Sequence, residues 1–149
     1  YALASVNTHD LPPAAGYLEY GHVKLREQLG LLSGPVEEFQ KSAEAEHNAM
    51  LSMLVDEGYL DASALEDELA NENEIIDALY RGLKGSPCKL MAASIVDAVG
   101  EKRTQNQPGT SNEYPNWRIP LADGDGNVVP LEQLFDNTRL QEIAAIMRS

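Results

Sequence analysis

The stretch ASVNTHDLPP, at residues 4–13, decides the fold because it leads from an apolar run through a polar corner into a helix start. The apolar residues Leu3–Val6 predict the end of a short buried strand. Asp10 is soon followed by two prolines, a pattern typical of a carboxylate N-cap before the first helical turn. His9 and Asp10 therefore follow a strand end, where barrels of alternating strands and helices carry functional residues. By spacing alone, a capping aspartate beside a surface histidine is the favoured interpretation.

Composition limits the class of protein. The 149 residues fit one domain, and the net charge of −13 argues against nucleic acid and anionic membranes as partners. The single cysteine, Cys88, excludes an internal disulfide and a cysteine-rich zinc site. No apolar run approaches the roughly 18 residues of a membrane span, and no signal peptide is visible. Since the chain starts at Tyr1 in strand-like sequence, we expect a soluble, cytoplasmic piece of a longer polypeptide.

Three helices are predicted after the first strand. Helical spacing of apolar residues, bounded by Gly and Pro, places them at about residues 10–29, 35–58 and 61–85. Asp61 or Ser63 is expected to cap the third helix. The apolar stripes on these helices are interpreted as core packing, so the protein is expected to be mostly α-helical.

A second buried strand is predicted at Leu90–Ile95, with a short helix as the alternative. Two parallel strands joined by helices form a crossover unit, which predicts an α/β fold with additional helices inserted. Asp97 stands just after this strand, in the same position that Asp10 holds after the first strand. For Asp97, a capping or supporting role is as plausible as a substrate contact. One or two final helices are expected over Leu131–Met147.

The long segment between the second strand and the final helices is rich in amides and contains the only tryptophan. Asn106, Asn116 and Trp117 offer amide groups and a flat apolar face, a mixture suited to binding sugars; a structural loop anchored by a buried Trp is equally consistent. The run DGDGN at residues 123–127 lacks the Gly and Glu that a calcium loop requires, so it predicts a tight turn. No metal site is predicted.

Three motifs resemble the C-terminal part of bacterial 4-alpha-glucanotransferases, also called amylomaltases or disproportionating enzymes. They are THDLPPAAGY (8–17), LGLL (29–32) and QNQPGTSNEYPNWRIPL (105–121), the last in a form that resembles the actinobacterial branch. The resemblance implies the C-terminal portion of a (β/α)₈ TIM barrel with inserted helices. It divides the chain 1–149 into four parts. Residues 1–32 hold a seventh strand with its His-Asp corner and helix, and residues 33–86 form a helical segment. Residues 87–121 hold an eighth strand with the Asn-Trp loop, and residues 122–149 form C-terminal helices.

The same resemblance implies the chemistry. Family members transfer a segment of an α-1,4-glucan between maltooligosaccharides with retention, which needs a nucleophile and an acid carboxyl about 5–5.5 Å apart. In the family these follow the fourth and fifth strands, which the chain does not contain. Asp10 corresponds to a third acid that stabilises the transition state, and His9 to a residue that contacts the sugar. Asn106, Asn116 and Trp117 are the expected substrate-binding residues. No cofactor is implied, and the chain alone is expected to be inactive.

Two other readings stay open at this stage. The chain could be an acidic, helical protein-interaction module without catalysis, or part of a different TIM-barrel α-glucan hydrolase. The distance between Asp10 and Asn106 discriminates, because an interaction module has no need to bring them together. In the isolated chain, two strands without their barrel neighbours would expose apolar edges, which either rearranged helices or a second copy of the chain could cover.

Overall fold

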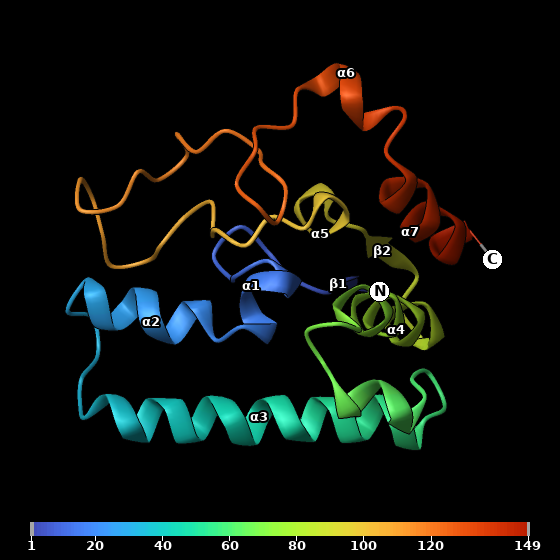
Figure 1. Cartoon of the computed structure of the whole chain (residues 1–149), viewed down its shortest axis with the longest axis horizontal. Coiled ribbons are helices and arrows are strands. Elements are labelled where there is room, and N and C mark those ends of the chain that lie inside the picture. Colours follow the sequence, from blue (N-terminus) through green and yellow to red (C-terminus); the bar gives the residue numbers. More distant parts are fainter. Residues whose placement is uncertain (1, 149) are drawn as a thin grey trace.

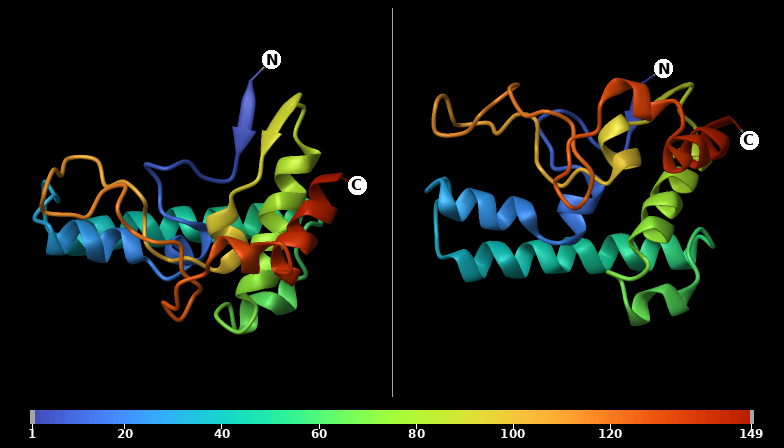
Figure 2. Two further views of the ribbon diagram at one scale, coloured as in Figure 1. Left: turned by 90° about the horizontal axis from the view of Figure 1, so that it is seen from above. Right: turned by 45° about the horizontal axis from the view of Figure 1, so that its top comes forward.

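The computed structural model describes residues 2–148, so Tyr1 and Ser149 of the predicted 1–149 unit lie outside it. Two short strands, β1 (Leu3–Ser5) and β2 (Leu90–Ala92), pair in parallel with Leu3 opposite Leu90. The predicted parallel crossover is therefore confirmed. Helices dominate the rest of the described chain, and the two strands lie side by side at one edge of the helical body (Figure 2).

The single helix predicted over residues 10–29 is instead two helices, α1 (Ala14–Leu18) and α2 (Gly21–Gln28). Tyr20 has a positive φ of 58°, which interrupts the helix. The N-cap of α1 is Pro13, so the prediction that Asp10 caps this helix is wrong. A residue that precedes a proline avoids the α conformation, which disfavours a helical Leu11 and Pro12, and Pro13 itself has a ψ of 155°, so the helix starts at Ala14. Asp10 is left in the preceding loop, with its carboxylate available for other contacts.

The helix predicted over residues 35–58 is confirmed as α3 (Val36–Asp56), which runs along one side of the molecule beside α2 (Figure 1). The helix predicted over residues 61–85 is divided into a short 3₁₀ helix, η1 (Ala62–Glu66), and α4 (Glu72–Gly85). Asp61 caps η1 as expected, because its carboxylate accepts the backbone N–H of Ser63 at 2.8 Å.

The second strand is shorter than predicted, because Ile95 already belongs to the helix α5 (Ile95–Val99). Asp97 therefore lies within a helix and not at the end of a strand. The expected final helices are present as α6 (Leu131–Leu134) and α7 (Thr138–Arg148). The β-branched residues Ile95 and Val96 favoured a strand in the prediction, whereas in the structure they begin a helix that buries Asp97, Ala98 and Val99.

The core lies where α4 meets α1, α3, α5 and α7. Its fully buried side chains include Leu54, Ile75, Ile76, Tyr80 and Ile143. The strands, by contrast, leave Leu3 and Leu90 largely exposed, at 66% and 62% of their surface. Within residues 2–148, no helix is both long and apolar enough to cross a membrane.

Candidate active site

A polar corner forms where β1 ends. Nδ2 of Asn106 donates a hydrogen bond of 2.6 Å to Oδ1 of Asp10, although the two residues lie far apart in the sequence. The backbone N–H of Asn106 also donates to the carbonyl of His9 at 3.2 Å. Nε2 of His9 lies 3.4 Å from Oδ2 of Asp10. The structure therefore brings His9, Asp10 and Asn106 together, which the carbohydrate interpretation requires and a simple interaction module does not.

Trp117 completes this corner. The centre of its ring lies 5.1 Å from that of His9, and the two rings are tilted by 43°. The side chain is 64% exposed, so the alternative of a buried Trp anchor is wrong. Trp117 has a positive φ of 62°, a conformation that is uncommon for a bulky residue and is found where surrounding contacts enforce it. The backbone thus holds an aromatic ring in solvent next to the imidazole of His9, and its exposed face is of the kind on which a sugar ring stacks.

Asn116 has a different environment from its neighbour. Its Oδ1 accepts the backbone N–H of Gln107 at 2.7 Å, and its Nδ2 donates to the hydroxyl of Thr110 at 2.8 Å. Both ends of the amide therefore stabilise the loop itself. Tyr114 also supports the loop, because its hydroxyl donates to the carbonyl of Thr104 at 2.7 Å. A direct contact between Asn116 and a sugar stays a prediction.

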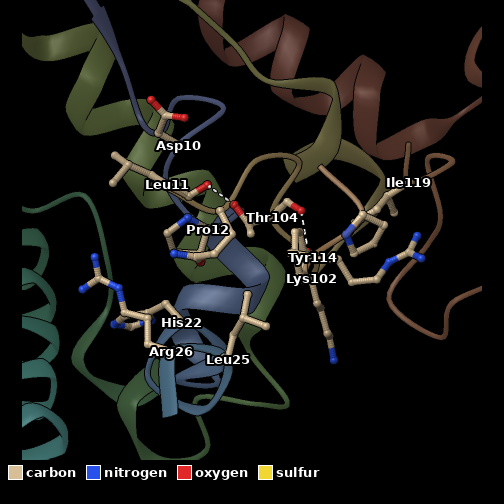
Figure 3. Close-up of a pocket in the computed structure, with 14 residues that line it drawn as sticks. Asp10, Leu11, Pro12, His22, Leu25, Arg26, Lys102, Thr104, Tyr114 and Ile119 are labelled. Atoms are coloured by element: carbon tan, nitrogen blue, oxygen red, sulfur yellow. Dashed lines mark hydrogen bonds between the residues drawn. The ribbon is translucent and has the colours of Figure 1, made fainter. Parts of the chain in front are cut away.

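Two cavities adjoin the corner. One of about 390 Å³ lies between α2 and the long loop, with Asp10 and Leu11 at one edge and Arg26, Tyr114 and Ile119 among its lining residues (Figure 3). Another of about 290 Å³ opens at the carboxyl ends of both strands and is lined by residues that include His9, Ala92 and Gln105. The second cavity occupies the end of the sheet at which parallel α/β folds bind ligands.

Asp97 lies behind the corner and not in it. Its side chain is 1% exposed and accepts the backbone N–H of Ala14 at 2.8 Å, at the start of α1. The supporting role is therefore confirmed, although the helix start that Asp97 supports is that of α1, and its burial leaves it no direct access to a substrate. Burial raises the pKa of Asp97, and hydrogen bonds from Tyr80, Ala14 and Asn7 act in the opposite direction.

The run DGDGN forms the tight turn that the sequence predicts. Asp123 Oδ1 accepts the backbone N–H groups of Asp125 and Asn127 at 3.0 and 2.9 Å, and Gly126 has a φ of 85°. No group of three His, Cys, Asp or Glu side chains within residues 2–148 is arranged to hold a metal ion.

Two parallel strands joined through helices, with a polar corner at their carboxyl ends, are the arrangement found in parallel α/β folds, α/β barrels among them. Residues 1–124 match the family described as 4-alpha-glucanotransferase, and the chain belongs to this family.

Curated relatives and a solved structure agree with this assignment. The chain is 48% identical over all of its 149 residues to the 4-alpha-glucanotransferases of Mycobacterium tuberculosis and Mycobacterium bovis. It is 29% identical over 143 residues to the enzyme of Haemophilus influenzae. The crystal structure of amylomaltase from Corynebacterium glutamicum matches 98% of the chain with a TM-score of 0.82 and 37% identity. The chain spans about 20% of the length of these curated relatives and 21% of the solved chain.

Proposed function

We propose that the chain works as part of a longer 4-alpha-glucanotransferase, which transfers a segment of an α-1,4-glucan from one maltooligosaccharide to another with retention of configuration. The observation that carries the proposal is the 2.6 Å hydrogen bond between Asn106 and Asp10 at the end of a barrel strand. The exposed ring of Trp117 beside His9 supports it, because together these groups offer a carboxylate, an amide and an aromatic face to a sugar.

Each residue of the corner has a chemical task in this proposal. The Asp10 carboxylate lies 48% exposed and stabilises the positive charge that develops on the sugar in the transition state. Asn106 holds that carboxylate by its amide, while His9 donates to a sugar hydroxyl. Trp117 provides a flat surface for the neighbouring glucose unit. No cofactor is required, since the nucleophile and the acid of a retaining glucanotransferase are carboxyl groups.

The proposal also concerns what the chain does by itself. The family resemblance assigns the nucleophile and the acid to earlier barrel strands, outside these 149 residues. A stabilising acid accelerates the reaction only when the reacting groups are assembled around it, so we expect the isolated chain to be inactive. Incubation with maltotriose tests this expectation, and the joint appearance of glucose and longer maltodextrins would contradict it.

Substitution of Asp10 tests the role of the corner. In a 4-alpha-glucanotransferase of full family length that contains these residues, Asp10→Asn is expected to lower kcat/KM about 10²–10³-fold, as removal of a preorganised electrostatic group does. Thermal stability should change little, because Asp10 is exposed. Asp125→Asn is a matched control at an exposed turn. Near-normal kcat/KM for Asp10→Asn would remove Asp10 from the catalytic machinery.

Two further parts of the proposal concern location and association. A cytoplasmic enzyme is consistent with the single cysteine and the acidic composition. For the isolated chain, the exposed Leu3 and Leu90 on the two strands support self-association through the strand edges. Sedimentation at increasing concentration tests this, and strict monomers at high concentration would contradict it.

A further inference from the structure

One buried carboxylate holds both ends of the loop that carries His9 and Asp10. Nδ2 of Asn7, at the start of this loop, donates to Oδ1 and Oδ2 of Asp97 at 2.7 and 2.9 Å. The backbone N–H of Ala14, directly after the loop, donates to Oδ1 of the same carboxylate at 2.8 Å. The loop is therefore closed at its base by hydrogen bonds to a single side chain.

This carboxylate is itself fixed from the core. The hydroxyl of Tyr80, in α4, donates to Oδ2 of Asp97 at 2.6 Å and accepts the backbone N–H of Ser94 at 3.0 Å. The side chain of Tyr80 is fully buried, and that of Asp97 is 1% exposed. Because close-packed neighbours surround both groups, the carboxylate cannot turn to follow the loop, and it serves as a rigid reference point.

The outer side of the loop is held differently. The hydroxyl of Thr104 donates to the carbonyl of Leu11 at 3.2 Å, and Asn106 donates to Asp10 at 2.6 Å. These contacts come from the long loop at the surface, where Asp10 itself is 48% exposed. The position of the Asp10 carboxylate thus depends on two sets of contacts. Asn106 holds its oxygen at the surface, and the buried hydrogen bonds at the base of the loop place its backbone.

We propose that Asn7 and Asp97 are positioning residues for glucan transfer, which hold the loop so that Asp10 faces the reacting sugar. This inference rests on the proposed function, in which Asp10 stabilises the transition state. Neither residue needs to contact the substrate. A misplacement of about 1 Å by a change remote from the reacting atoms can lower a rate about a hundredfold, so loss of the anchor should reduce kcat more than it changes KM.

The test uses Asn7→Ala in a 4-alpha-glucanotransferase of full family length that contains these residues. We expect kcat for maltotriose to fall about tenfold or more, with KM changed by less than about twofold. Amide hydrogen exchange of a peptide that covers residues 8–14 should become faster, while that of α3 stays unchanged. Asp61→Ala is the matched control, since it removes a hydrogen bond from a backbone N–H to a side chain at the start of η1. It should change neither kcat nor the hydrogen exchange of residues 8–14. Asp97→Asn, which replaces one accepting oxygen by NH₂, should lower kcat at least as much as Asn7→Ala.

A double-mutant cycle with Asp10→Asn separates positioning from general destabilisation. If Asn7 acts through Asp10, Asn7→Ala should lower kcat by less than about twofold in the Asp10→Asn background. An equal loss in both backgrounds, or an unchanged kcat for Asn7→Ala, would overturn the inference. Full activity of Asp10→Asn alone would overturn the proposed role of Asp10 itself, so the two failures are distinguishable.

Discussion

The hydroxyl of Tyr80 allows a quantitative prediction about stability. Tyr80→Phe removes a 2.6 Å hydrogen bond to the Asp97 carboxylate and also leaves the N–H of Ser94 without its 3.0 Å acceptor. A hydrogen bond to a charged group contributes about 1.5–3 kcal/mol, and a buried N–H without an acceptor costs about 1–3 kcal/mol. Since Ser94 is half-buried, we expect the free energy of unfolding to fall by about 3 kcal/mol.

Urea unfolding followed by circular dichroism measures this change, and for a domain of this size 3 kcal/mol corresponds to a Tm decrease of about 6–12 °C. Tyr59→Phe is the control, because it makes the same chemical change at a half-buried tyrosine whose hydroxyl makes no hydrogen bond within residues 2–148. Its effect should stay within about 0.5 kcal/mol. A loss below about 1 kcal/mol for Tyr80→Phe, or equal losses for both variants, would refute the reasoning.

Two further changes test the long loop and its contact with α1. Burial alone would raise the pKa of Glu101, but hydrogen bonds, chiefly from Arg103, lower this pKa below its ordinary value of 4.5. The ionised Glu101 therefore stabilises the fold at neutral pH, and Glu101→Gln should be less stable than the wild type. The difference in the free energy of unfolding, measured with urea, should shrink as the pH falls below about 4.5. Gly16→Ala would place a Cβ 2.2 Å from the carbonyl oxygen of Lys102, so we expect a loss of about 1–3 kcal/mol, whereas Gly34→Ala, with 3.7 Å to its nearest neighbour, should have little effect. An unchanged Tm for Gly16→Ala would contradict this.

The parts of the fold that the sequence predicts well are those in which local pattern and burial agree. Apolar periodicity predicts α3 almost to the residue. It fails between residues 10 and 29, where Tyr20 adopts a left-handed backbone conformation that no local pattern indicates. It fails again at Ile95, because a short apolar run has no period that separates a strand from a helix.

The candidate site was predictable only in part. The His9–Asp10 corner and Asn106 were found through motifs, since no local rule indicates that residues so distant in sequence are in contact. The anchor at Asp97 required the fold, because its partners come from separate elements. His47 was missed in the same way: it lies isolated in the sequence, yet its Nε2 is 2.7 Å from Oε2 of Glu68 in the turn that follows η1. Contacts between residues of different elements depend on how the helices pack against each other, and the apolar periodicity of a single helix does not predict that packing.

The register of the two short strands has a consequence for how this protein tolerates change. Residues 3–5 pair with residues 90–92, and both halves of the polar corner follow the carboxyl ends of that pair. A slip of two residues would displace one half by about 6.6 Å, which is farther than the Asn106 side chain can compensate. An insertion at the exposed residues 33–35, between α2 and α3, should leave the register untouched. An insertion between β1 and the corner, by contrast, would separate His9 and Asp10 from the strand that places them.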